Sequence, residues 1–215
     1  MLEDCKRIAR ETGDLAAFEY CTSNGEQGRC QERSAFCPIY RTMRMWERWG
    51  IPERERILLK GDILGTKPLS DRLSMRVVKA RVARRVGPAG VKGTEALVVL
   101  AGKCDVGKTV AATWALSRTG GRYITACEFS ELGLRMRELK DVNTLVIDQL
   151  GTEPIGGSEW ALGTFLDVVD NRFANMRLTI VCTNMLREEF EPRYSRIFTR
   201  RLNSDGVFIR LGDAS

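Results

Sequence analysis

Five short apolar runs punctuate the second half of the chain, and longer stretches with helical spacing separate them. The runs are five or six residues long and rich in β-branched side chains. They cover residues 96–101, 122–126, 144–148, 178–183 and, more weakly, 206–210. Strands that are apolar on both faces and alternate with helices are typical of a parallel sheet in an α/β domain. We therefore expect a central parallel five-stranded sheet flanked by helices.

Three helical stretches can be recognised besides the helix expected directly after the first run. One lies between the third and fourth strands, where Leu162, Phe165, Leu166, Val169 and Phe173 mark one apolar face. A second covers residues 71–86, and a third, interrupted at Gly50-Ile51-Pro52, covers residues 41–60.

The first 95 residues lack the alternation of strands and helices. Gly61, Gly65 and Pro68 indicate a linker. We divide the chain into a small N-terminal module that is expected to bind a partner (1–60), a linker (61–70) and a main domain (71–215).

The sharpest motif lies between the first apolar run and a predicted helix at 109–116. It reads Gly-Lys-Cys-Asp-Val-Gly-Lys-Thr, the G-x-x-x-x-G-K-T pattern of a phosphate-binding loop. Glycines let the backbone N–H groups wrap around phosphates, Lys108 can reach the β- and γ-phosphates, and the Thr109 hydroxyl can bind Mg²⁺. The residues expected to contact the nucleotide are Gly102, Lys103, Cys104, Asp105, Val106, Gly107, Lys108, Thr109 and Val110.

Two polar residues follow apolar strands further along. Asp148 ends the third strand and is a candidate to hold Mg²⁺ together with Thr109. Asn184 follows the fourth strand and could orient an attacking water, or it could simply cap a turn. Because the carboxyl ends of parallel strands meet at one edge, both residues are expected near the phosphate loop.

Four arginines cluster near the end of the chain: Arg193, Arg196, Arg200 and Arg201. Arg196 and Arg200 are four apart and would share one helix face. Such arginines neutralise charge on a transferring phosphoryl group, often from a neighbouring subunit. A solvated basic helix or a nucleic-acid surface fits them equally well.

The chain of 215 residues contains no histidine, which excludes histidine-based acid–base chemistry and imidazole metal ligands. Its net charge of +6 is uneven: residues 1–93 carry +7 and residues 94–215 carry −1. This asymmetry suggests a polyanionic partner such as nucleic acid, or a solvated basic face. No membrane span or signal peptide is visible in the sequence, so we expect a cytoplasmic protein without a membrane partner.

Taken together, these residues resemble the DnaC-type helicase loaders and the related IstB transposition helpers within the AAA+ ATPases. The resemblance covers roughly residues 71–215. The matching stretches are 102–109, 122–129, 145–151 with Glu153-Pro154, 158–160, 179–184 and 193–200.

The resemblance implies a P-loop AAA+ core without a C-terminal helical lid, and it implies roles for individual residues. Lys108 and Thr109 would be the Walker A pair, Asp148 the Walker B metal residue and Asn184 sensor 1. Arg196 and Arg200 would act across a subunit boundary during self-association. The family activity would be ATP- and Mg²⁺-dependent assembly on single-stranded DNA and delivery of a replicative DnaB-type helicase.

One departure from the family pattern concerns the residue after Asp148. The family usually has an acidic base there, whereas this chain has Gln149. An amide can orient water but cannot accept its proton, and loss of a general base typically slows a reaction by about 10²–10⁴-fold. We expect tight ATP binding with slow hydrolysis, unless Glu153 folds back to substitute.

The N-terminal module carries Cys5, Cys21, Cys30 and Cys37. Loaders of this type often have a zinc-binding N-terminal module, so these four thiolates are candidate Zn²⁺ ligands. Their spacing lacks a C-x2-C pair, and four reduced cysteines in a cytosolic protein explain them as well.

Three functions remain open at this point. The first is the helicase loader, the second is a transposition helper ATPase that assembles on duplex DNA, and the third is an ATP-binding adaptor that does not hydrolyse its nucleotide. The residues that bind nucleotide do not separate the first two, and Gln149 favours the third.

Overall fold

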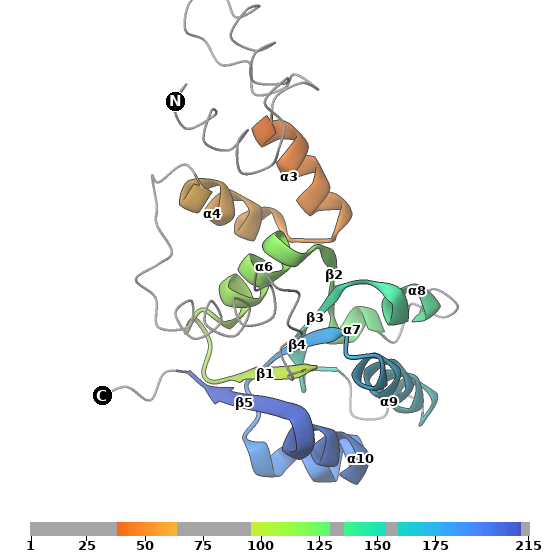
Figure 1. The fold of residues 1–215 in the computed structure, drawn as a ribbon. Helices are drawn as coiled ribbons and strands as arrows, with labels where there is room; N and C mark the ends of the chain where they lie inside the picture. The colour runs from red at the N-terminus through yellow and green to blue at the C-terminus, as the bar shows by residue number, and fades with distance from the viewer. Residues whose placement is uncertain (1–37, 64–95, 130–135, 154–158, 212–215) are drawn as a thin grey trace, which may run out of the picture. The chain divides into compact units, whose positions relative to one another are not determined.

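The computed structural model describes residues 38–63, 96–129, 136–153 and 159–211 (Figure 1). The chain divides into two compact units, Met1–Ser70 and Asp71–Ser215. The predicted helix at 71–86 and most of the predicted linker lie outside the described residues. No helix in the described ranges is long and apolar enough to cross a membrane.

The first unit contributes two helices, α3 (Pro38–Arg48) and α4 (Glu53–Ile63), which contact each other. The chain turns between them at Gly50, whose φ of 80° suits glycine. This turn is where the sequence predicts an interruption. The helix α4 runs on through Gly61 to Ile63, the first three residues of the predicted linker. A single glycine near a helix end costs only about 1 kcal/mol and did not stop α4.

The second unit is built on a five-stranded sheet with the order β2-β3-β4-β1-β5, and all its strand pairs are parallel. The strands are β1 (Leu97–Ala101), β2 (Gly121–Thr125), β3 (Thr144–Leu150), β4 (Leu178–Thr183) and β5 (Gly206–Arg210). All five apolar runs therefore form strands, as predicted. Four strand ends differ by one or two residues. The strand β1 begins one residue later than predicted, and β2 begins and ends one residue earlier, because Ala126 already begins α7 (Ala126–Phe129). The strand β3 continues two residues past Asp148.

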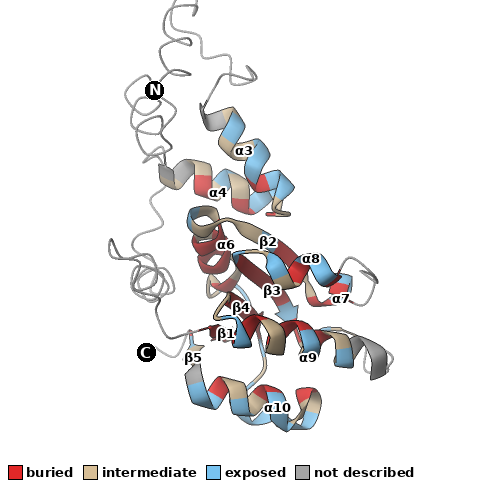
Figure 2. Ribbon diagram, turned by 45° about the vertical axis from the view of Figure 1, so that its right-hand side comes forward, coloured by how far each residue is buried: buried red, intermediate tan, exposed pale blue. Residues whose placement is uncertain are grey.

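Helices cover both faces of this sheet (Figure 1). One face carries α6 (Lys108–Thr119), which contacts β3 and β4. The other face carries α7, α8 (Met136–Asp141), α9 (Glu159–Ala174) and α10 (Phe190–Asp205), the last preceded by the short η2 (Arg187–Glu189). Figure 2 shows that β1, β3, β4 and most of α6 are buried, while β5 is only partly covered and α10 exposes its outer side.

Alternating strand residues supply these two faces. Leu97, Val99, Leu145 and Ile147 pack into a cluster with Phe165, Phe190, Tyr194 and Phe198 from α9 and α10. Because side chains alternate across a strand, Val98, Val146 and Asp148 point to the opposite face, where α6 lies. The chemistry-bearing Asp148 is thus directed towards the helix that follows the phosphate-loop motif.

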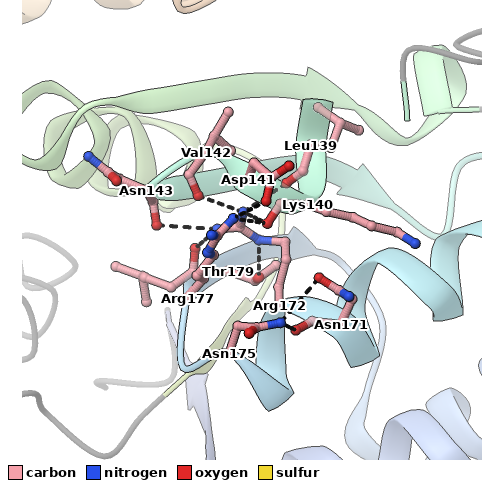
Figure 3. A network of polar contacts seen from close by, with 11 residues as sticks. Leu139, Lys140, Asp141, Val142, Asn143, Asn171, Arg172, Asn175, Arg177 and Thr179 are labelled. Carbon is pink, nitrogen blue, oxygen red and sulfur yellow. Dashed lines mark hydrogen bonds and ion pairs between the residues drawn. The ribbon is translucent and has the colours of Figure 1, made fainter. Parts of the chain in front are cut away.

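The amino ends of β3 and β4 are closed by a buried arginine, Arg172 of α9 (Figure 3). Its Nε donates to the Thr179 hydroxyl at 3.0 Å, and Nη1 and Nη2 donate to the Val142 and Leu178 carbonyls at 2.7 Å each. Further donations reach carbonyls of Leu139, Lys140 and Asn143. The last carbonyls of a helix lack partners within it. Arg172 therefore donates hydrogen bonds to carbonyls at the end of α8 as well as to groups at the amino ends of the two strands.

Candidate nucleotide-binding site

The phosphate-loop motif joins the carboxyl end of β1 to the start of α6. Three residues in the loop have positive φ: Gly102 (147°), Asp105 (64°) and Gly107 (90°). At Gly102 a Cβ would lie 2.3 Å from the Leu211 carbonyl oxygen, so glycine is required there. The loop therefore curls tightly, in the way that turns backbone N–H groups inward.

The amide groups of this loop fit an anion. Residues 104 and 105 form a turn, and among the described residues no longer-range backbone hydrogen bond is donated by the N–H groups of residues 103–107. The helix α6 begins immediately afterwards and adds the positive end of its dipole. A phosphate group would satisfy these donors, as the sequence motif predicts.

Lys108 folds back over the same loop. Its side chain is buried, and its Nζ donates to the carbonyl oxygens of Gly102 and Lys103 at 2.6 Å each. Both acceptors belong to the loop itself. The ammonium is therefore already held at the loop and needs only to exchange carbonyl partners for phosphate oxygens.

The two candidate metal residues are brought together. Thr109 Oγ1 donates to Asp148 Oδ2 at 2.8 Å, although the residues are 39 positions apart. Asp148 is buried, and its Oδ1 accepts from the Gln149 backbone N–H at 2.8 Å. One residue that the sequence analysis did not single out joins them, because the Tyr123 hydroxyl donates to Oδ2 at 2.7 Å.

Cys182 lies fully buried in the middle of the sheet, on β4. Burial raises the pKa of its thiol well above the usual value, and the negative charge of Asp148 raises it further. The raised pKa means that Cys182 keeps its proton and is a neutral thiol in the folded protein.

Asn184 follows β4 and lies beside the phosphate loop. Its Nδ2 is 3.6 Å from the Cys104 sulfur, and both side chains are exposed. The expectation that the carboxyl end of β4 brings this amide to the loop agrees with the geometry.

Gln149 adopts an unusual backbone conformation for a side-chain-bearing residue, with φ of 59°. Its carbonyl oxygen accepts from Thr152 N at 3.1 Å and Thr152 Oγ1 at 2.8 Å, which closes a turn directly after Asp148. The Gln149 side chain is exposed at this edge of the sheet. Left-handed backbone at a non-glycine residue costs about 1–2 kcal/mol, so the surrounding turn holds it there.

Glu153 is occupied by other partners. Its Oε2 accepts from Gly151 N at 2.8 Å, and its Oε1 accepts from Arg193 at 3.2 Å and from the Tyr194 hydroxyl. Burial and the hydrogen bond to Glu153 raise the pKa of Tyr194 above its usual value. These contacts hold Glu153 between the end of β3 and α10. They argue against the possibility, raised in the sequence analysis, that Glu153 replaces the missing catalytic base.

The arginine cluster separates into two kinds of residue. Arg193 pairs with Glu153, and Arg201 pairs with Asp170 at 2.6 Å, so both join α10 to other parts of the domain. Arg196 and Arg200 are exposed. Both follow Ser195, where a φ of 73° breaks α10. The structure does not bring Arg196 or Arg200 to the phosphate loop of their own chain.

Similarity to known proteins is confined to solved structures; neither a family model nor a curated protein sequence matches the chain. The DnaC helicase loader has a TM-score of 0.51 at 17% identity, over 67% of this chain and 91% of its own. DnaI has a TM-score of 0.50 at 19% identity, over 75% of this chain and 87% of its own. AMPPCP-bound DnaA from Aquifex aeolicus has a TM-score of 0.51 at 16% identity, over 66% of this chain and 47% of its own.

The chain has the P-loop AAA+ fold. The likeness to these structures and the sheet order, with the phosphate loop after β1, agree on this architecture. The chain spans about half the length of the DnaA chain. At sequence identities of 16–19%, these comparisons establish the fold of the chain only.

Within the AAA+ fold, two neighbours of Asp148 had no signal in the sequence. Tyr123 lies in an apolar run and Cys182 in another, where both are expected as core residues. Only the order of strands, with β2 and β4 on either side of β3, shows that they lie near Asp148.

The candidate zinc ligands Cys5, Cys21, Cys30 and Cys37 lie outside the described residues. Over residues 38–63, 96–129, 136–153 and 159–211, no group of three or more Cys, Asp or Glu side chains could hold a metal ion. The zinc site therefore stays a prediction from the sequence.

Proposed function

We propose that this protein binds ATP with Mg²⁺ at the loop 102–109 and acts as a DnaC-like helicase loader, which delivers a replicative helicase to single-stranded DNA. The observation that carries the proposal is the Thr109–Asp148 contact of 2.8 Å directly beside the phosphate loop. A hydroxyl and a carboxylate paired at the start of α6 are the two protein groups that a nucleotide-bound magnesium ion requires.

Each group at this edge has a separate part in binding. The amides of residues 103–107 hold the phosphates, and Lys108 leaves the Gly102 and Lys103 carbonyls to meet them. Thr109 and Asp148 hold the metal side. The ion itself would neutralise charge on the β- and γ-phosphates.

Hydrolysis would be slow because no described carboxylate is placed to accept a proton from the attacking water. Gln149 and Asn184 can only orient that water, and Glu153 is engaged by Arg193 and Tyr194. This arrangement also favours a second candidate, an adaptor that responds to ATP binding without hydrolysing it. In both cases the nucleotide acts as a switch.

Self-association would complete the site in neighbouring subunits. Arg196 and Arg200 are exposed on α10, after the break at Ser195. In this position they are available to a phosphate bound in another copy of the chain. Arg193, which is already paired with Glu153, serves as the matched control for them.

The partner assignment rests on similarity and charge. The DnaC helicase loader and DnaI are among the structures with this fold, and the net charge of +7 in residues 1–93 favours a nucleic-acid partner. We assign helicase binding to the N-terminal module, residues 1–60, which the sequence analysis expects to bind a partner.

Binding to single-stranded and double-stranded DNA, each with ATP and with ADP, tests the function. A helicase loader binds single-stranded DNA more tightly with ATP, loses affinity as salt rises, and retains a DnaB-type helicase in a pull-down. The Lys108→Ala variant should lose the effect of ATP. Preference for duplex DNA together with capture of a transposase would contradict the proposal and favour the transposition helper.

A further inference from the structure

The helix α3 of the first unit carries its arginines on one side. Arg41, Arg44 and Arg48 follow one another at intervals of three and four residues, which places them on one helix face. All three are exposed, whereas Trp46, on the opposite side of the helix, is 2% exposed. We call these three residues the arginine face of α3. The nucleotide site belongs to the second unit and makes no use of them.

The acidic residue of α3 cannot neutralise this face. Glu47 is the single acidic residue of the helix, against three arginines. It is shared, because its Oε2 pairs with Arg44 at 2.5 Å and its Oε1 with Arg56 of α4 at 3.7 Å. Exposed ion pairs contribute only about 0–1 kcal/mol, so Arg44 can exchange Glu47 for another anion at little cost.

A phosphate backbone fits the arginine face better than a protein surface does. Protein surfaces that bind tightly are centred on large side chains that fill a pocket of the partner. Among the described residues of α3, Met45 is the only exposed large hydrophobic residue, at 39%, and Trp46 is turned inward. Phosphates need cations alone. The three arginines span about 10 Å along the helix axis, which covers about three nucleotides of one strand.

An aromatic residue borders the arginine face. Tyr40 precedes Arg44 by four residues, so the two are neighbours on the helix surface, and Tyr40 is partly exposed. Surfaces that bind single-stranded nucleic acid combine a row of cations with aromatic rings on which unpaired bases stack. In a duplex the bases are already stacked on one another, so this combination favours a single strand.

We propose that the arginine face of α3 binds the phosphate backbone of single-stranded DNA and that Tyr40 stacks on one of its bases. This inference rests on the proposed function, which requires binding of single-stranded DNA and leaves its residues unassigned. It agrees with the net charge of +7 in residues 1–93. The N-terminal module would then hold the strand as well as the helicase.

The experiment measures the affinity of the full chain, with ATP and Mg²⁺, for a fluorescent oligothymidylate by anisotropy at a series of salt concentrations. For a single strand, the logarithm of the affinity falls with the logarithm of the salt concentration by about 0.7 for each phosphate neutralised. The triple variant Arg41→Gln, Arg44→Gln, Arg48→Gln should therefore reduce the magnitude of this slope by about 2.

Two control variants separate charge from packing. The triple variant Arg41→Lys, Arg44→Lys, Arg48→Lys keeps three cations that can bind phosphate as point charges, so its slope should match the wild type. Arg54→Gln removes an exposed arginine from the neighbouring helix α4 and should also leave the slope unchanged.

Tyr40 has a different expected signature. Tyr40→Ala should lower the affinity for the single strand by at least about fivefold, because a stacked base is lost, and should leave the salt slope unchanged. Tyr40→Phe keeps the ring and should bind like the wild type. Equal affinities of Tyr40→Ala and the wild type would overturn the stacking role.

The other failures are distinguishable. A wild-type slope in the glutamine variant would overturn the arginine-face role while the proposed function stands. An equally reduced slope in the glutamine and lysine variants would also overturn it, because damage to the helix would then explain the loss. Loss of helicase capture with an unchanged DNA slope would show that the face binds a protein instead. Absence of single-strand binding by the wild-type protein would overturn the proposed function and this inference with it.

Discussion

Each end of the sheet buries a basic side chain, and the two side chains differ in the segments to which they donate hydrogen bonds. At the amino ends of β3 and β4, Arg172 is 0% exposed and donates to five carbonyls and one hydroxyl, contributed by α8, β4 and the segment before β3. At the carboxyl ends, Lys108 is 9% exposed and donates to two carbonyls, both of which belong to the phosphate loop that precedes it.

The difference separates a structural cation from one that is available to a ligand. Arg172 joins three separate segments, so moving it would leave several buried carbonyls without donors. Lys108 bonds only to carbonyls of the loop, and the loop amides donate no longer-range backbone hydrogen bond to the other described residues. A buried basic residue by itself therefore says little about function; what matters is which groups lose a partner when it moves.

The largest expected effect is on stability at the Arg172 edge. Arg172→Met should lower the free energy of unfolding by about 3–5 kcal/mol, because each buried carbonyl left without a donor costs about 1–3 kcal/mol. Urea denaturation measures the loss. A change below about 1 kcal/mol would show that water replaces the guanidinium and would remove the contrast between the edges.

The next effect concerns the chemistry of the carboxyl edge. Gln149→Glu places a carboxylate directly after Asp148 without altering chain length or the turn held by Thr152. Restoring a base should raise steady-state ATP hydrolysis by about 10²-fold, with little change in nucleotide affinity. Thr152→Ser, which keeps the hydroxyl, is the control. Brisk hydrolysis by the wild-type protein would contradict the assignment of Gln149 as the cause of slow turnover.

A smaller expected effect concerns the contact between Tyr194 and Glu153, which we assign to stability rather than to catalysis. Because the pKa of Tyr194 is raised in the folded protein, the tyrosine keeps its proton at pH values where the unfolded chain has lost it. Its contribution to stability is complete below pH ~10 and falls as the pH rises further, by up to about 1.4 kcal/mol per pH unit. Tyr194→Phe lacks this term, so urea unfolding from pH 8 to 11 should show the wild type losing its advantage. Parallel curves would argue against the contact with Glu153.

Much of this fold is visible in the sequence because its signals are local. The apolar runs at 97–101 and 178–183 are buried strands, and the spacing of Gly102, Gly107 and Lys108 marks the phosphate loop. The placement of Asp148 beside Thr109 could also be predicted, since strand ends of a parallel sheet meet at one edge.

The rest depends on contacts between distant segments. Arg172 reads as an ordinary polar residue of an amphipathic helix, and only the packing of α9 against α8 and β4 reveals the six groups it satisfies. Tyr123 reads as a core residue until β2 is known to lie next to β3. The positive φ of Gln149 likewise follows from the turn with Thr152, which no local pattern indicates.

The most direct test of the account is the affinity of the full chain for ATP in the presence of Mg²⁺, measured by calorimetry for the wild type and for Lys108→Ala. The account predicts one saturable site in the wild type and a loss of affinity of at least about 30-fold in Lys108→Ala, since truncating one member of a buried charge pair costs about 2–5 kcal/mol. It also predicts a free energy of unfolding within about 1 kcal/mol of the wild type, because the partners of Lys108 lie on the loop alone. Equal ATP affinity in the two proteins, or no binding by the wild type, would contradict the claim that this loop holds a nucleotide.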